Sequence, residues 1–238
     1  HVENHFEANN TAYIVMEFLD GISVKEFMKQ EGGKLDMETA LEIAFAVSEA
    51  LQEIHDASIL HRDISPDNVF LCEGNKVKVL DFGAARLSDT EKEVTRSIIL
   101  KPGFAPPEQY QTKSNQGPWT DVYSLCATMY YLLTGIKLQK AYERVAEDKT
   151  IPLNMFNIEI EDYQANAILK GLNVQIEDRY QSMAELYYEL YHEYLPGEKP
   201  QKPTAEAVRQ KTMPEIMPIP DITREEAAMQ YLKQHSED

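Results

Sequence analysis

Three short segments in the middle of the chain concentrate side chains that bind cations and accept protons. Residues 61–68 read His-Arg-Asp-Ile-Ser-Pro-Asp-Asn, residues 81–83 read Asp-Phe-Gly, and residues 105–108 read Ala-Pro-Pro-Glu. Carboxylate and amide oxygens are hard ligands that suit Mg²⁺, and a carboxylate can also act as a general base. Asp-Phe-Gly alone arises often by chance, so the argument depends on all three segments occurring in this order.

In this order and rough spacing, the three segments resemble the signature set of Ser/Thr-type protein kinases. The stretches Leu-Lys-Pro-Gly-Phe-Ala-Pro-Pro-Glu-Gln-Tyr (100–110) and Gly-Pro-Trp-Thr-Asp-Val-Tyr (117–123) are similar to bacterial members of that family. The resemblance extends over about residues 1–195. It implies phosphoryl transfer from ATP, with Mg²⁺, to Ser or Thr of a protein substrate.

The resemblance implies a role for three residues in the chemistry itself. Asp63 matches the catalytic-loop aspartate that orients the substrate hydroxyl and accepts its proton. Asn68 and Asp81 match the amide and the carboxylate that hold Mg²⁺ across the phosphates. The expected metal ligands are therefore Asn68 and Asp81.

The nucleotide is expected beside a strand and hinge at residues 12–19. The expected cofactor-binding residues are Met16, Glu17, Leu19, Ser23 and Phe70. By resemblance, the methionine occupies the gatekeeper position, and the next two residues present their backbone to the adenine edge. The serine would reach the ribose, and the phenylalanine would form the apolar floor under the ring.

Other matches concern residues that hold a kinase active site together. They are His61, Arg62, Phe82, Gly83, Glu108, Asp121 and Arg179. His61 and Phe82 resemble members of an apolar stack, and Arg62 resembles the arginine that pairs with a phosphorylated activation-loop residue. Glu108 and Arg179 resemble a buried ion pair, while Asp121 resembles the aspartate that braces the catalytic loop.

One departure from the family pattern concerns Ser65 and Lys101. Ser/Thr kinases usually carry Lys two residues after the catalytic Asp and Thr seven residues before the Glu of the Ala-Pro-Glu motif. Here these positions hold Ser65 and Lys101, so a hydroxyl and a lysine have exchanged places. Because lysine is a flexible point charge, we expect Lys101 to supply the missing charge near the γ-phosphate and Asp63. The alternative is a solvated Lys101 beside a serine that is merely small.

A second departure lies before the hinge. Residues 1–24 contain neither Lys nor Arg, and their one glycine is Gly21. They therefore hold no glycine-rich loop and no lysine for the α- and β-phosphates. The sequence predicts an N-terminally truncated kinase domain with little or no activity by itself.

The fold class expected is α+β, a kinase-like fold with a mostly α-helical C-terminal lobe, two residual N-lobe strands and a hinge. Alternation and β-branched residues predict strands at 2–6 and 11–18 and a hairpin at 69–72 and 76–80. Apolar spacing predicts helices at 36–57, 121–134, 163–172 and 182–195. Asp36 is the expected N-cap of the first helix and Gly135 the expected C-cap of the second. His55, on the first helix, is expected to be a packed, hydrogen-bonded core histidine. The expected division is strands and hinge at 1–20, C-lobe at 21–195 and a Pro-rich tail with a short helix at 196–238.

Charge and composition argue against two classes of binding partner and indicate a cellular compartment. The net charge of −17 argues against binding to a nucleic-acid backbone, and the sequence has no apolar run of roughly 18 residues that would span a membrane. Its two cysteines, Cys72 and Cys126, do not form a disulfide framework, so a reducing cytoplasmic compartment is expected. A membrane tether outside these residues stays open.

Two other functions remain as alternatives. A pseudokinase or regulatory binding module would typically have lost one of Asp63, Asn68 and Asp81, and all three are present. A small-molecule phosphotransferase of the aminoglycoside type usually carries Gly at the position of Arg62 and lacks the segment that contains Glu108. Both observations favour the protein kinase.

Overall fold

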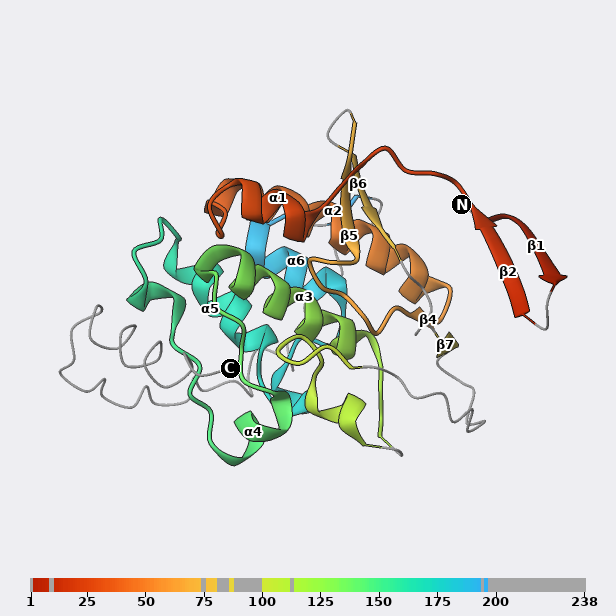
Figure 1. Cartoon of the computed structure of the whole chain (residues 1–238). Coiled ribbons are helices and arrows are strands. Elements are labelled where there is room, and N and C mark those ends of the chain that lie inside the picture. Colours follow the sequence, from red (N-terminus) through yellow and green to blue (C-terminus); the bar gives the residue numbers. More distant parts are fainter. Residues whose placement is uncertain are drawn as a thin grey trace.

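A computed structural model describes residues 2–8, 11–73, 76–80, 86–87, 100–111, 114–193 and 195–196. Its helices are α1 (Val24–Gln30), α2 (Met37–Asp56), α3 (Pro118–Thr134), α4 (Ala141–Ala146), α5 (Asp162–Gly171) and α6 (Met183–Tyr191). Short 3₁₀ turns are η2 (Pro107–Tyr110), η3 (Leu153–Met155) and η4 (Ile176–Asp178). The α+β class expected from the sequence is confirmed, since helices form most of the body (Figure 1).

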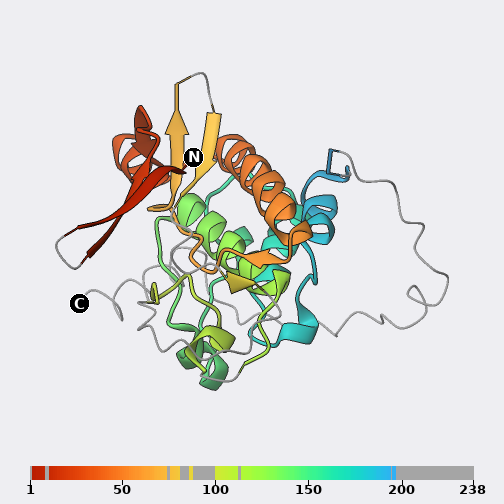
Figure 2. The same ribbon diagram turned by 90° about the vertical axis from the view of Figure 1, so that its right-hand side faces the viewer.

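The described strands form three small antiparallel sheets. β1 (Val2–Ala8) pairs with β2 (Thr11–Met16), and this hairpin projects from the helical body in Figure 1. β3 (Gly21–Ser23), β5 (Val69–Cys72) and β6 (Lys76–Val79) form the second sheet, in the order β3-β5-β6. β4 (Ile59–Leu60) pairs with β7 (Arg86–Leu87). Figure 2 shows β5 and β6 beside one end of α2.

The expected helix at 36–57 is confirmed as α2, and its start has a local cause. Asp36 is the N-cap, and its Oδ1 accepts a hydrogen bond from the backbone N–H of Thr39 at 2.9 Å. Ala40, Ala44 and Val47 then turn one apolar face toward the core. A capping residue followed by a three- and four-residue apolar period is thus enough to define this element.

Helix α3 forms the centre of the core. It begins at Pro118, three residues before the expected start, because proline fits the first turn of a helix. It ends at Gly135, which has φ of 73° and serves as the left-handed C-cap that the sequence predicts. All but a few of its residues are buried, so neighbouring elements contact it on every side.

Other boundaries differ from the sequence prediction. The helix expected at 182–195 ends at Tyr191, because His192 adopts the left-handed conformation with φ of 53°. α1, β3 and α4 were not expected, since elements of three to seven residues show too little periodicity to detect. The tail helix expected after residue 196 lies outside the described residues.

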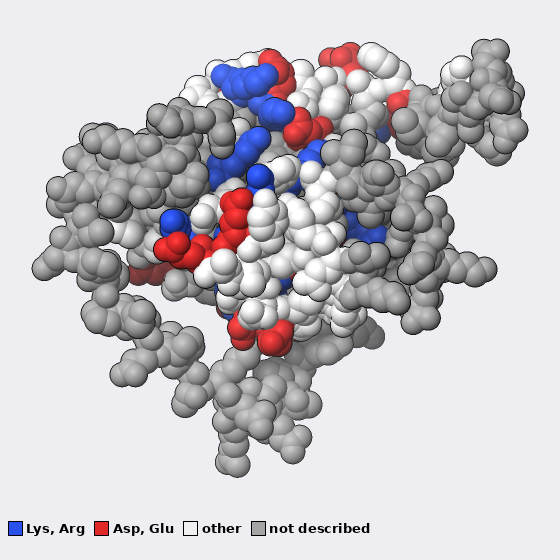
Figure 3. Space-filling view, turned by 60° about the horizontal axis from the view of Figure 1, so that its bottom comes forward, with Lys and Arg blue, Asp and Glu red and all other residues white. Residues whose placement is uncertain are grey.

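Surface charge is unevenly distributed. In the view of Figure 3, Lys and Arg side chains gather in the upper half of the face, with Asp and Glu beside them and lower down. Within the described ranges, no helix is long and apolar enough to cross a membrane.

Candidate active site

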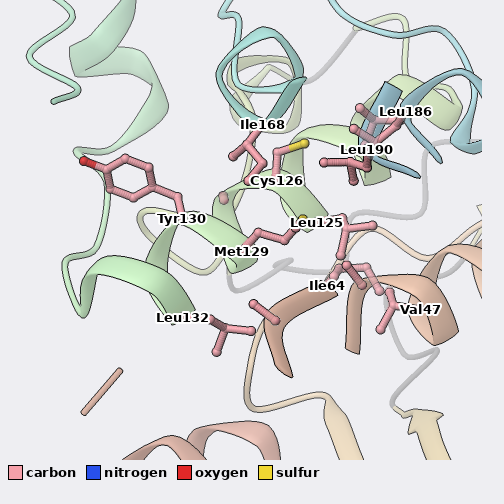
Figure 4. Packing of buried hydrophobic residues seen from close by; sticks show 14 of the residues in the cluster. Val47, Ile64, Leu125, Cys126, Met129, Tyr130, Leu132, Ile168, Leu186 and Leu190 are labelled. Atoms are coloured by element: carbon pink, nitrogen blue, oxygen red, sulfur yellow. The ribbon is translucent and has the colours of Figure 1, made fainter. Parts of the chain in front are cut away.

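The segment that contains Asp63 is anchored by its neighbours. Ile64 is 1% exposed and lies between Val47 of α2 and Leu125 of α3 (Figure 4). Ser65 is also fully buried, whereas the Asp63 side chain keeps 22% of its surface exposed. The buried neighbour therefore fixes the loop to the core while the carboxylate stays accessible.

A single buried carboxylate on α3 holds the start of this loop. Asp121 Oδ2 accepts hydrogen bonds from the backbone N–H of His61 at 2.9 Å and from His55 Nε2 at 2.8 Å. Its Oδ1 accepts from the backbone N–H of Arg62 at 2.7 Å. Arg62 has φ of 71°, which is unfavourable for a non-glycine residue, so these bonds stabilise a strained backbone. Asp121 lies where the family resemblance places the loop's brace.

The ring of His61 has one tautomer that satisfies both of its contacts. The backbone N–H of Asp63 donates to Nδ1 at 3.3 Å, so Nε2 carries the proton and donates to the carbonyl of Leu80 at 3.1 Å. The side chain is fully buried. His61 thus ties the catalytic loop to the end of β6, just before residues 81–83.

Two of the expected site residues, Asn68 and Lys101, contact the Asp63 carboxylate, and Ser65 joins them through Lys101. Asn68 Nδ2 donates to both the carbonyl and Oδ2 of Asp63, each at 2.8 Å. Lys101 Nζ lies 3.3 Å from Asp63 Oδ2 and donates to Ser65 Oγ at 2.9 Å. Within the part of the chain that the structure describes, both of these side-chain contacts engage Oδ2, which leaves Oδ1 for an acceptor hydroxyl.

Lys101 therefore lies beside the position that the family lysine would occupy. Its carbonyl accepts hydrogen bonds from the backbone N–H groups of Phe104 and Ala105, both at 3.1 Å, which fixes the backbone there. Its side chain is 29% exposed. The contact with Ser65 is the geometry expected if the lysine and the hydroxyl have exchanged places.

A second anchor lies under the segment that follows Lys101. Arg179 donates to Glu108 through Nη1 at 2.7 Å and Nη2 at 2.9 Å, and both side chains are almost fully buried. Thr120 Oγ1 also donates to Glu108, at 3.1 Å. The Arg179 guanidinium stands 4.9 Å from the centre of the Tyr123 ring. The structure thus brings together the two residues expected as a buried ion pair.

The expected cofactor-binding residues occupy the junction between the hairpin and the body. Ser23 faces Phe70 across the β3–β5 pairing, and Lys78 of β6 pairs with Phe70 on the other side. Lys78 Nζ contacts Glu17 Oε1 at 2.8 Å, and this lowers the pKa of the Glu17 carboxyl. Met16 ends β2, and Leu19 is half-buried in the hinge.

Ser23 has a second task that the sequence did not indicate. Its Oγ accepts from the backbone N–H of Glu26 at 3.1 Å, so Ser23 is the N-cap of α1. A hydroxyl retains a donor while it accepts. Ser23 can therefore cap α1 and still donate a hydrogen bond to the ribose, as expected.

The described half of the expected metal site has suitable chemistry. The two acceptors on Asp63 require the Asn68 amide nitrogen to face them, which leaves its oxygen as the hard donor for a cation. Asp81, Phe82 and Gly83 lie outside the described residues. Among those described, no group of three or more His, Cys, Asp or Glu side chains is arranged to hold a metal ion.

Two contacts at the loop were missed by sequence reasoning. Lys25, on α1, donates to Asp67 Oδ1 at 2.8 Å, and Gln109 Nε2 donates to the carbonyl of Arg62 at 2.7 Å. Lys25 belongs to no motif identified above, and Gln109 lies in the quoted stretch 100–110 but had been given no role. His55 was expected only as a hydrogen-bonded core histidine, and six residues separate it from His61. His55 is the penultimate residue of α2, close in sequence to the loop that begins at His61.

The family model described as "Protein kinase domain" matches residues 1–213. The chain is 31% identical over 228 residues to serine/threonine-protein kinase PknB of Mycolicibacterium smegmatis, which covers 92% of the chain and 36% of that protein. It is 34% identical over 201 residues to PknB of Mycobacterium tuberculosis, covering 80% and 32%. The chain thus spans about a third of the length of these relatives.

A solved structure titled "PpkA-294 apo form" is similar in fold as well as in sequence. The TM-score is 0.69 and the sequence identity is 35%, over 80% of this chain and 67% of that one. The match supports the arrangement of helices and small sheets described above.

Proposed function

The chain belongs to the protein kinase domain family, and we propose that it transfers the γ-phosphoryl group of ATP to Ser or Thr of protein substrates. The observation that carries this proposal is the convergence of Asn68 and Lys101 on the Asp63 carboxylate, at 2.8 and 3.3 Å. The names of the relatives support Ser and Thr as acceptors.

Asp63 is the proposed base. Its carboxylate would orient the acceptor hydroxyl and take up the proton as the new P–O bond forms. When bound, ATP with Mg²⁺ supplies the transferable group and neutralises much of its charge. Asn68 and Asp81 are the residues that would hold the metal, and the hinge at Glu17 and Leu19 would receive the adenine.

Lys101 is the proposed phosphate contact. Phosphoryl transfer depends on positioning and on charge stabilisation, so a cation must lie close to the transferring group. Ser65 is neutral, and Lys101 brings the missing ammonium to within hydrogen-bond distance of it. Because Lys101 also contacts Asp63 Oδ2, it would position the base at the same time.

The direct test measures transfer of labelled phosphate from ATP to a Ser- and Thr-containing protein, using the natural protein that carries this sequence at its full natural length. Asp63→Asn, which keeps the shape and removes the base, is expected to lower turnover by a factor of about 10²–10⁴. Unchanged folding, judged by the thermal midpoint, is the control. Wild-type turnover in Asp63→Asn would contradict the proposal.

The 238-residue chain taken alone is expected to transfer little phosphate. Residues 1–24 contain neither Lys nor Arg to contact the α- and β-phosphates ahead of the hinge. Robust phosphorylation of a generic protein by this chain would overturn that expectation. Titration of Mg²⁺–ATP by calorimetry on the full-length protein separates the proposal from a pseudokinase that binds a partner without turnover.

A further inference from the structure

The charges that border Asp63 differ in sign from those of the chain as a whole. The chain carries −17 overall, yet Lys101 contacts Asp63, Lys25 contacts Asp67, and Lys137 lies over the ring of Phe104, three residues after Lys101. These three ammonium groups are called the lysine rim below.

Lys137 is the most exposed member of the rim. Its Nζ lies 6.0 Å from the ring centres of both Phe104 and Tyr131, a geometry that attracts a cation to the ring faces. Phe104 is buried beneath it, and its backbone N–H donates to the carbonyl of Lys101. Lys137 therefore lies over the ring of Phe104, whose backbone is hydrogen-bonded to the lysine that contacts Asp63.

Gly103 makes this close approach possible. It has φ of 86°, and a Cβ atom there would lie 2.8 Å from the carbonyl oxygen of Leu138 and 3.4 Å from Lys137 Cβ. Any other residue would push the segment after Lys101 away from the segment after α3. The position of Lys137 beside the site is thus set by the backbone and not by a flexible side chain alone.

Lys25 closes the other side of the rim. Its backbone N–H donates to the carbonyl of Pro66, and its Nζ donates to Asp67. This hydrogen bond raises the pKa of Lys25, and the nearness of Tyr131 adds to the effect. Tyr131 therefore links Lys25 to Lys137. Because Asp67 is already paired, it offers little attraction to a basic group on a substrate.

We propose that the lysine rim selects acceptor segments that carry carboxylate side chains beside the Ser or Thr, with Lys137 as the specificity-determining residue. This proposal rests on the proposed kinase function. The overall negative charge does not oppose it, because salt screens exposed charges beyond about 8 Å at physiological ionic strength. Because Lys25 pairs with Asp67 and Lys101 pairs with Asp63, Lys137 is the member of the rim on whose charge the selection depends.

Three fluorescent peptides with one Thr, flanked by Glu, Gln or Lys, test this directly by anisotropy with the full-length protein. The Glu peptide is expected to bind roughly fivefold tighter than the Gln peptide for each close charge pair, and the Lys peptide weakest. Lys137→Glu should reverse the order of the Glu and Lys peptides. Lys137→Met keeps the side-chain stem on the rings and removes the charge. It should abolish the part of the affinity difference between the Glu and Gln peptides that the Lys137 charge contributes.

The matched control is Lys170→Glu. Lys170 also stands over a tyrosine ring, 4.1 Å from the centre of Tyr180, but it belongs to α5. It changes the net charge by the same amount and should leave the peptide order unchanged. Equal binding of the three peptides, or a reversal in Lys170→Glu as large as in Lys137→Glu, would overturn the inference.

Turnover of the same peptides separates this inference from the proposed function. The proposed function fails if no peptide is phosphorylated. The order of the three peptide affinities tests the lysine rim independently of turnover. If phosphorylation occurs, Lys137→Glu should raise KM for the Glu peptide and leave kcat and the KM for ATP within about twofold. A loss confined to kcat would contradict a role in selecting the acceptor segment.

Discussion

The β1–β2 hairpin and the helical body differ in how far their apolar side chains are buried. Phe6, Tyr13 and Val15 of the hairpin are between 37% and 48% exposed, and Phe18, in the hinge that follows, is 91% exposed. In the body, α3 alone buries Tyr123, Leu125 and Met129 completely or almost so. The body thus has its own hydrophobic core, whereas the hairpin is held by strand pairing and by one stacked pair of rings, Phe6 on Tyr13.

The proposed catalytic residues belong to the better-packed of these two regions. Asp63, Asn68 and Lys101 are all supplied by the body, and the loop that carries them is tied to α2 and α3 through His55 and Asp121. The expected adenine-binding positions lie at the border with the hairpin. The proposed chemistry is therefore assigned to the region that has its own hydrophobic core.

The largest effect on stability is expected at the buried Glu108–Arg179 pair. Glu108→Gln leaves the buried guanidinium without its counter-charge and should lower the free energy of unfolding by about 3–5 kcal/mol. Lys78→Met, which breaks the exposed pair with Glu17 at the border with the hairpin, should leave the denaturation midpoint within error. Equal losses in urea titrations of the two variants would contradict the contrast between the two regions.

Packing of the body predicts the next largest effect. A Cβ atom on Gly171 would lie 2.2 Å from Cys126 Sγ, so Gly171→Ala should cost about 1–3 kcal/mol through overpacking. Cys126→Ala removes the sulfur. The double variant should therefore be more stable than the sum of the two single losses predicts. If the free-energy losses of the two single variants add strictly in denaturant titrations, the side chain at position 171 and the Cys126 sulfur do not contact each other.

A smaller effect, with a pH dependence, is expected at the N-cap of α2. Hydrogen bonds from the backbone and side chain of Thr39 lower the pKa of Asp36 below its ordinary 3.8. The stabilisation of the fold by ionised Asp36 is therefore complete above pH 3.8, the ordinary pKa, and is lost as the pH falls through the lowered pKa. Asp36→Ala should cost about 1 kcal/mol at pH 7.

Asp36→Asn provides the control for this prediction. Asparagine also caps a helix, so stability at pH 7 should stay near that of the wild type while this group's part of the acid dependence disappears. Thermal midpoints between pH 2 and pH 7 compare the variants. An unchanged acid profile in Asp36→Asn would mean that Asp36 does not contribute through its charge.

The smallest effect is expected in the hinge. Phe18 is 91% exposed, so Phe18→Ser should change the free energy of unfolding by no more than about 0.5 kcal/mol. The same substitution at Phe104, buried beneath Lys137, serves as the comparison and should cost several times more. A large loss on Phe18→Ser would show that the hinge packs against something that the described residues do not include.

Sequence alone predicted the elements whose signals are local and repeated. Asp36 before a periodic apolar face and Gly135 after one predicted the ends of α2 and α3, and both are confirmed. It did not predict α1, whose seven residues are ordered by the Ser23 cap and by the bond from Lys25 to the catalytic loop. Such short elements depend on tertiary contacts that no local pattern encodes.

The candidate site likewise contains residues that the sequence predicted and residues that it did not. The motifs predicted which residues gather at Asp63, because their spacing in the chain reflects a shared architecture. They did not predict Gln109 or Lys137, whose positions depend on how η2 and the segment after α3 pack against the loop. Long-range contacts of single side chains are set by the fold as a whole, so they required the structure.

Reciprocal exchange of Ser65 and Lys101 tests the central claim most directly. In the full-length protein, Lys101→Thr alone is expected to lower kcat by about 10²–10³, because the ammonium near Asp63 is lost. The double variant Ser65→Lys/Lys101→Thr, which restores the usual family arrangement, should recover most of that loss. Wild-type kcat in Lys101→Thr, or no recovery in a double variant that folds as the wild type does, would contradict the account.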